Sequence, residues 1–216
     1  MLIFSQARLV LLSVPKTGST AYEAALAPFA AIAVSAPPEL KHAPLFRYNR
    51  FFRPMVERFF EGSFDVAAVM REPVDWLGSW YRYRRRPEMA GHVNSTQKLS
   101  FDAFVAAYCA GDQPSYANVG RQAKFLEPQR NGVRVTHLFR YEDQAGLRQF
   151  LEARLGVTVA PESVNRSPVL PLNLSPESAA RLRRKYADDF SLWGGIGADG
   201  TYQAQPPKPR PEDRAD

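Results

Sequence analysis

The sequence predicts a single α/β domain in which helices flank a central parallel sheet on both faces. Two nearly continuous apolar runs, at residues 8–14 and 64–70, have the pattern of strands that are buried on both sides. Each run is followed by a segment with helical features, and strands that alternate with helices are typical of parallel sheets. The 216 residues, of which 45% are hydrophobic and 23% charged, can build one such domain around its own core.

In the first half, prolines and glycines bound the elements. Pro28 ends the first helix and Pro37-Pro38 ends the strand after it, because proline cannot donate a backbone hydrogen bond. Gly62 and Ser63 mark a turn before the second apolar run. In chain order, we expect a strand at 8–14, a helix at 18–26, a strand at 30–34, a loop at 39–44, a helix at 50–60 and a strand at 64–70.

In the second half, capping residues mark the helix starts. Pro73 fits a first helical turn, where a missing N–H costs nothing, and Ser100 and Ser175 fit N-caps. The domain is expected to span residues 1–202, and the proline-rich residues 203–216 to form a disordered tail. In chain order, we expect a helix at 73–85, a loop at 88–100, helices at 101–110 and 119–126, a strand at 133–139, a helix at 142–155, an irregular segment at 161–171 and a helix at 175–187.

The composition indicates which kinds of ligand and which cellular location to expect. The net charge of +6 suits anionic partners such as nucleotides and sulfated or phosphorylated substrates. The single cysteine, Cys109, excludes an intrachain disulfide, and the three scattered histidines give no metal-binding pattern, so no metal site is predicted. Polar residues interrupt the apolar start, and no run nears the roughly 20 apolar residues of a membrane span, so we expect a cytoplasmic protein without a signal peptide.

The segment Pro15-Lys16-Thr17-Gly18-Ser19-Thr20 lies between the first strand and the first helix and is predicted to bind phosphate. Backbone N–H groups and the helix dipole attract anions at a helix start. Lys16 adds a full charge, and Ser19 and Thr20 add hydroxyl donors. Because Lys16 precedes Gly18, whereas the lysine of GxxxxGK[ST] follows the last glycine, an ordinary nucleotide triphosphatase is disfavoured.

A second candidate phosphate site begins where the strand at 64–70 ends. Arg71 stands at that strand end, and Ser79 follows eight residues later, about two turns into the next helix. A guanidinium and a hydroxyl so placed can hold one phosphate. The alternative is that Arg71 forms an ion pair with Glu72 or Asp75 while Ser79 faces solvent. Since ligands of parallel sheets bind at the carboxyl ends of the strands, both candidate sites are expected at one edge.

Together the two segments resemble the sulfotransferases that use 3′-phosphoadenosine 5′-phosphosulfate (PAPS). PKTGST is similar to the family's loop for the 5′-phosphosulfate, and RxPxxxxxSxY, at 71–81, to its motif for the 3′-phosphate. Weaker likeness to the closing order of bacterial members extends the resemblance to roughly residues 9–193. Trp76 departs from the pattern, because many relatives that act on carbohydrates have arginine there. The weaker matches are Arg140-Tyr141-Glu142-Asp143, Val164-Asn165-Arg166-Ser167 and the segment 174–193.

The resemblance implies a fold, a donor and an acceptor class. It implies a P-loop nucleotide-hydrolase-like topology and transfer of the sulfuryl group of PAPS to a hydroxyl or amine, with adenosine 3′,5′-bisphosphate as product. The acceptor would be a small molecule or a carbohydrate. Lys16 would stabilise the bridging oxygen as negative charge grows on it. The residues implied to bind the donor are Pro15, Lys16, Thr17, Gly18, Ser19, Thr20, Arg71, Ser79 and Arg166.

The identity of the general base stays open. His42 lies in the expected loop after the second strand, on the same edge of the sheet, and Glu23 lies about one turn into the first helix. Some branches of the family use histidine and others glutamate at comparable places. Three possibilities therefore remain for the general base: His42, Glu23, or another group.

Two other functions remain as alternatives. A nucleotide or small-molecule kinase with a degenerate P-loop would need an acidic residue closing a buried strand, where this chain has Arg71. A non-enzymatic polyanion-binding protein could use the basic run Arg82-Tyr83-Arg84-Arg85-Arg86. Cations near a helix C-terminus are also favoured by the dipole alone, and no stable nucleic-acid partner is expected.

Overall fold

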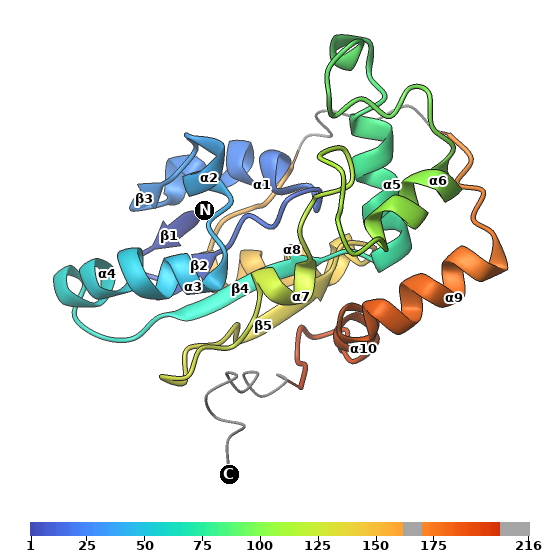
Figure 1. Cartoon of the computed structure of the whole chain (residues 1–216). Helices are drawn as coiled ribbons and strands as arrows, with labels where there is room; N and C mark the ends of the chain where they lie inside the picture. Colours follow the sequence, from blue (N-terminus) through green and yellow to red (C-terminus); the bar gives the residue numbers. More distant parts are fainter. Residues whose placement is uncertain (162–169, 204–216) are drawn as a thin grey trace.

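The computed structural model describes residues 1–161 and 170–203 and has a five-stranded sheet with helices on both faces (Figure 1). The strand order is β3-β1-β2-β4-β5. The α/β class predicted from the sequence is therefore confirmed. The strands are β1 (Leu2–Phe4), β2 (Leu9–Leu11), β3 (Ile32–Ala33), β4 (Asp65–Met70) and β5 (His137–Arg140).

The expectation of a wholly parallel sheet is wrong for β1. β1 pairs antiparallel with both β2 and β3, whereas β2–β4 and β4–β5 are parallel. Leu2 lies opposite Leu11 and Phe4 opposite Leu9, so β1 and β2 form a hairpin across residues 5–8. Two strands joined by so short a turn can pair only antiparallel. The other four strands share one direction, so their carboxyl ends lie at one edge.

Ten α-helices lie in the described residues, and three of them, α2, α3 and α10, are not expected from the sequence. α2 replaces part of the loop expected at 39–44, and α10 follows a break of the last expected helix at Tyr186. The serine caps are confirmed, because Ser100 accepts from Ala103 N and Ser175 from Ser178 N. The helices are α1 (Ser19–Leu26), α2 (Pro38–Lys41), α3 (Leu45–Arg47), α4 (Arg53–Phe59), α5 (Pro73–Tyr83), α6 (Phe101–Tyr108), α7 (Gln122–Phe125), α8 (Gln144–Leu155), α9 (Pro176–Lys185) and α10 (Ala187–Gly194).

Shorter helical turns complete the described fold. They are the 3₁₀ turns η1 (Ala27–Phe29) and η3 (Pro87–Met89) and the π-helical turn η2 (Tyr48–Phe52), which joins α3 to α4. The helix expected at 50–60 thus begins earlier and changes its hydrogen-bond pattern before α4. None of the helices in the described ranges is long and apolar enough to cross a bilayer.

The core consists of two layers on the sheet and a third cluster beside it. Leu26 of α1 and Leu147 of α8 pack on one face of the sheet, against side chains such as Val69. Tyr48 and Val56, from η2 and α4, pack on the other face. The third cluster joins α5, α6 and α9. This packing fixes α5 beside the carboxyl ends of β2 and β4.

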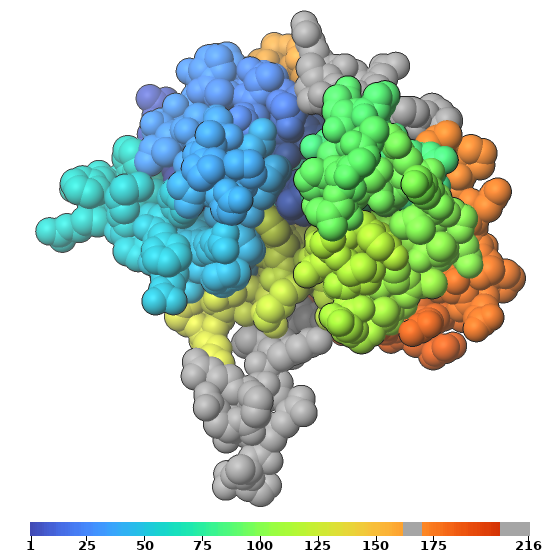
Figure 2. Space-filling model, turned by 45° about the horizontal axis from the view of Figure 1, so that its top comes forward, coloured from blue at the N-terminus to red at the C-terminus, as the bar shows by residue number. Residues whose placement is uncertain are grey.

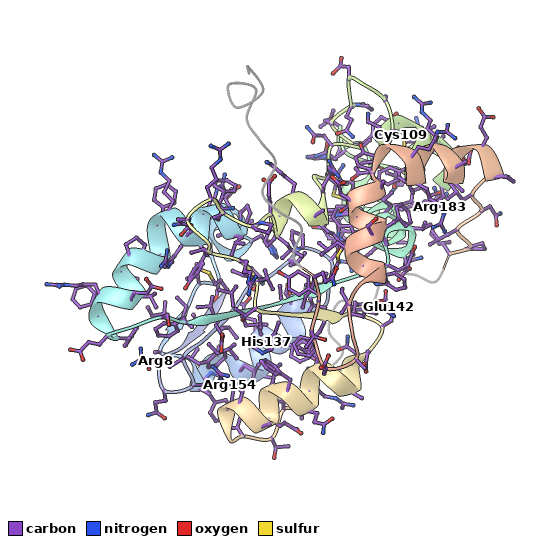
Figure 3. All side chains as sticks on the ribbon, turned by 90° about the horizontal axis from the view of Figure 1, so that it is seen from below. Arg8, Cys109, His137, Glu142, Arg154 and Arg183 are labelled. Atoms are coloured by element: carbon purple, nitrogen blue, oxygen red, sulfur yellow. The ribbon has the colours of Figure 1, made fainter. Side chains whose placement is uncertain are left out.

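The amino-end edge of the parallel strands is held by an ion pair. Arg154 Nη2 lies 2.6 Å from Asp65 Oδ2 at the start of β4, and Arg154 Nε donates to Ala7 O at 2.8 Å. Figure 3 shows Arg154 beside Arg8 and His137 at this side of the molecule. The ion pair ties α8 to the sheet at the edge opposite to the candidate phosphate loop.

Candidate active site

The two segments that the sequence predicts to bind phosphate are in direct contact. β2 leads into the loop at 15–20 and β4 ends at Arg71, so both lie at the carboxyl-end edge, as expected. Arg71 Nη1 donates to Lys16 O at 3.3 Å, and Trp76 Nε1 donates to Pro15 O at 2.9 Å. Residues more than fifty positions apart therefore form one constellation at the sheet edge.

The loop is a tight turn that only glycine fits at its helical end. Gly18 has φ 75° and is the N-cap of α1, and Lys16 has φ 67°. A Cβ at Gly18 would lie 3.3 Å from Tyr141 Cε2, closer than side chains normally approach. Thr17 Oγ1 donates to Val14 O at 2.9 Å and closes the turn. Within the described residues no side chain caps α1, so its first N–H groups can receive an anion.

Lys16 lies on an aromatic surface of α5. Its Nζ is 4.1 Å from the centre of the Tyr83 ring and 5.6 Å from that of Trp80. Burial lowers the pKa of Lys16 to about 8, and the charges of Arg86, Arg71 and Arg82 add to this lowering. An amine that is desolvated among cations is stabilised by a nearby anion.

Arg71 belongs to an ion-pair network, as the alternative interpretation of the sequence predicts, but Ser79 does not face solvent as that interpretation expects, because it is buried. Its guanidinium contacts Asp75 Oδ2 at 2.6 Å, and Arg82 Nη2 contacts Asp75 Oδ1 at 3.0 Å. Burial alone would raise the pKa of Asp75, but Arg71 and Arg82 hold it below its ordinary value. The Arg71 guanidinium also lies 4.2 Å above the Tyr141 ring. Asp75 is thus shared by two arginines, and both of them also act, with Arg86, on the Lys16 amine.

The backbone of Arg71 is fixed from a third element. Gln122, at the start of α7, accepts from Arg71 N at 2.9 Å and donates to Arg71 O at 2.8 Å. Its side chain is 1% exposed, so these bonds are shielded from water. Ser79, the second residue of the predicted 3′-phosphate pair, is also buried, two turns into α5.

The basic run at the end of α5 does not form a uniform patch. Arg84 Nη1 donates to the Ser115 and Tyr116 carbonyls. Arg85 Nη1 donates to Thr96 O and Leu99 O, both at 3.1 Å. These two arginines therefore hold neighbouring loops, and Arg82 and Arg86 are the members of the run that act on Lys16.

The two candidate bases lie near this edge but differ in their surroundings. His42 follows α2, and its Nδ1 lies 2.7 Å from Ser13 O. Burial lowers the pKa of His42, which keeps its ring neutral near pH 7. Glu23 forms an ion pair with Lys41 at 2.9 Å. Burial favours a higher pKa for Glu23, but hydrogen bonds from Lys41 and Ser35 bring it below its ordinary value.

The surface is hollowed between the early part of the chain, which holds the loop at 15–20, and the segment that includes α5 (Figure 2). The space-filling view shows a hollow between the blue segments early in the chain and the green segment of α5 and the loop that follows it (Figure 2). A small pocket of about 10 Å³, room for about one water molecule, lies between α1 and the sheet. Ser19 and Glu23 line it together with apolar core side chains such as Leu147. Arg166, the remaining candidate, lies outside the described residues.

No family model, curated protein or solved structure matches the chain. In residues 1–161 and 170–203, no three His, Cys, Asp or Glu side chains gather as metal ligands.

Sequence reasoning did not assign several residues that shape the site. The sequence indicates Asp75 only as a possible partner of Arg71, and Tyr83 only as part of the basic run. Tyr141 and Gln122 received no role, although they fix the Arg71 guanidinium and backbone. The signal that the sequence offers is the short spacing of Asp75 from Arg71, across the corner where β4 ends and α5 begins.

Proposed function

We propose that this chain is a sulfotransferase that transfers the sulfuryl group of PAPS to a hydroxyl or amine of an acceptor. The observation that carries the proposal is the 3.3 Å contact between Arg71 of the RxPxxxxxSxY segment and Lys16 of the PKTGST loop. Two segments that resemble PAPS-binding motifs, far apart in sequence, lie together at the carboxyl ends of parallel strands, which supports the proposal. The parallel pairs β2–β4 and β4–β5 agree with the proposed P-loop-like topology, whereas the antiparallel β1 beside β2 departs from it.

The residues present fit a nucleotide that is phosphorylated at two positions. The uncapped N-terminus of α1 and the hydroxyls of Ser19 and Thr20 suit the 5′-phosphosulfate. Arg71, where β4 ends, suits the 3′-phosphate, and by resemblance Ser79, buried in this structure, is proposed as its partner. Arg71 must then exchange part of its contact with Asp75 for the phosphate, and Arg82 still neutralises Asp75 when it does. By resemblance Arg166 is proposed for the same donor.

Bound PAPS would supply an activated sulfuryl group whose S–O bond breaks as the bond from acceptor to sulfur forms. Lys16 is proposed to neutralise the charge that grows on the bridging oxygen. Its amine lies on the Tyr83 ring, and its neighbouring charges are cations that do not neutralise it. An anionic ligand beside the amine would therefore be favourable. Trp80 and Tyr83 shield this amine from water, which strengthens its electrostatic effect.

His42 is the better supported base. A carbonyl oxygen only accepts, so the contact with Ser13 O requires the proton on His42 Nδ1 and leaves Nε2 with a free lone pair. That lone pair can take the proton of the acceptor. Glu23 is already neutralised by Lys41, and its lowered pKa makes it a weaker base.

His42→Ala is expected to lower turnover by about 100-fold while the affinity for adenosine 3′,5′-bisphosphate stays within about twofold. The reason is that the ring acts on the acceptor proton and not on the donor phosphates. Transfer of labelled sulfuryl from PAPS gives the first quantity and calorimetry the second. Glu23→Gln is the matched control and should keep most of the activity. Wild-type turnover in His42→Ala would remove His42 from the role.

The affinity for the bisphosphate is expected to fall as the pH rises above about 8. In the free protein Lys16 has a pKa of about 8, and a bound anion raises it, so binding takes up a proton in this range. Affinity is thus fully present below about pH 8 and is lost as the pH passes the bound-state pKa. Calorimetry in buffers of different ionisation enthalpy measures the uptake. Lys16→Arg should remove this pH dependence; a wild-type profile in that variant would contradict it.

The function itself is tested with labelled PAPS and a panel of carbohydrate, phenolic and lipid acceptors. The proposal predicts label on one acceptor class and equal release of adenosine 3′,5′-bisphosphate. Magnesium-dependent transfer from ATP, with no transfer from PAPS, would favour the kinase alternative instead. The polyanion-binding alternative is weakened because Arg84 and Arg85 are engaged with backbone carbonyls.

A further inference from the structure

The segment from η2 through α4 presents large apolar side chains to solvent. Phe51, Met55 and Phe59 follow one another at four-residue spacing and are 62%, 40% and 78% exposed. We call these three residues the α4 stripe. On an adjoining side of the same segment, Tyr48 and Val56 are fully buried in the core, so the helix is anchored while the stripe is displayed.

The α4 stripe lies on a part of the molecule that projects. Figure 2 shows the cyan segment standing out from the rest of the surface, and Figure 3 shows its side chains pointing away from the ribbon. In Figure 1, α4 and α5 lie at opposite ends of β4. The stripe is therefore separate from the proposed donor site.

Positive charge flanks the stripe. Residues 45–60 contain one acidic residue, Glu57, which is paired with Arg53 at 2.8 Å. Arg50 and Arg58 are exposed, and the Arg50 guanidinium lies 5.4 Å from the centre of the Phe51 ring. The four arginines of this range are Arg47, Arg50, Arg53 and Arg58. After the one ion pair is counted, the segment keeps a positive surplus beside its apolar stripe.

We propose that α4 docks this chain on an anionic lipid surface. The stripe would bury its rings and thioether at the boundary between headgroups and acyl chains, and Arg50 and Arg58 would lie at the lipid phosphates. A second copy of the chain would bring arginines against arginines on molecules of net charge +6. A nucleic acid would satisfy the charges but would leave Met55 and the edge of the stripe in water. The proposal is independent of sulfotransferase activity.

Co-sedimentation of the full chain with vesicles tests the proposal. Phosphatidylcholine vesicles with and without phosphatidylglycerol provide the anionic and neutral surfaces. Wild type is expected to sediment with anionic vesicles, and added salt should weaken the binding. Phe51→Ser/Phe59→Ser should lose about 100-fold or more of the partitioning, since burial of each ring is worth about tenfold or more. Arg50→Gln/Arg58→Gln should lose the preference for the anionic surface.

Phe29→Ser is the matched control, because Phe29 is 52% exposed on η1, outside the stripe. It should bind as wild type does, and circular dichroism checks that all variants are folded. The proposal is overturned if wild type does not prefer anionic vesicles or if the double phenylalanine variant still binds them. It is also overturned if light scattering shows a dimer of the wild type that the double phenylalanine variant dissociates. The same holds if that variant loses binding to an RNA oligonucleotide but still binds the vesicles.

Discussion

Arg71→Ala is expected to weaken the binding of adenosine 3′,5′-bisphosphate by about 10²–10³-fold, the largest effect on affinity at this site. The substitution removes the guanidinium proposed for the 3′-phosphate and leaves Asp75 with Arg82 alone. A carboxylate with less compensation then faces the incoming phosphate, and like charges repel. Calorimetry with the purified variant measures the loss.

Two further variants separate the phosphate contact from the ion pair. Arg71→Lys keeps the charge but not the planar fork, so it should fall between alanine and wild type. Arg71→Ala/Asp75→Asn removes the repelling carboxylate and should recover part of the affinity. If Arg71→Ala binds the bisphosphate as tightly as wild type while its thermal unfolding is lowered, Arg71 has a structural role only.

Lys16→Ala is expected to reduce turnover by about 10²–10³-fold, with a smaller loss in bisphosphate affinity. The reason is that charge on the bridging oxygen develops during transfer and is weaker in the ground state. Measuring turnover at saturating PAPS with an acceptor from the panel separates the loss of rate from the loss of affinity, because the donor site is then full.

Tyr83→Leu is the control for the environment of Lys16. It removes the ring that lies 4.1 Å from Nζ but keeps the amine, so turnover should fall far less than in Lys16→Ala. Equal losses in the two variants would mean that Lys16 matters for packing on α5. Full activity of Lys16→Ala would remove it from the mechanism.

The local part of the fold could be predicted from the sequence. The strand at 64–70 and the loop at 15–20 are marked by apolar runs and by Pro15, Gly18 and Pro73, whose effects are confined to neighbouring residues. The hairpin between β1 and β2 was missed because its polar turn at 5–8 interrupts one apolar run only briefly. The break at Tyr186 has no glycine or proline to mark it.

In the site, the positions of the residues could be predicted from the sequence, but the directions of their side chains could not. The positions of Lys16 and Arg71 follow from strand ends, which the sequence indicates. The direction of each arginine in the run at 82–86 depends on loops that arrive from elsewhere in the chain. Arg84 donates a hydrogen bond to the carbonyl of Ser115, and no local sequence pattern predicts that contact. Charge counted along the sequence therefore overstates the charge that the site can use.

The central claim is that this edge of the sheet holds a nucleotide phosphorylated at both the 3′ and the 5′ position. Calorimetric titration of the wild-type chain with adenosine 3′,5′-bisphosphate and with adenosine 5′-monophosphate tests it directly. The account predicts that the bisphosphate binds at least about tenfold more tightly, because the 3′-phosphate adds the contact with Arg71. Equal affinities for the two nucleotides, or no binding of the bisphosphate, would contradict it.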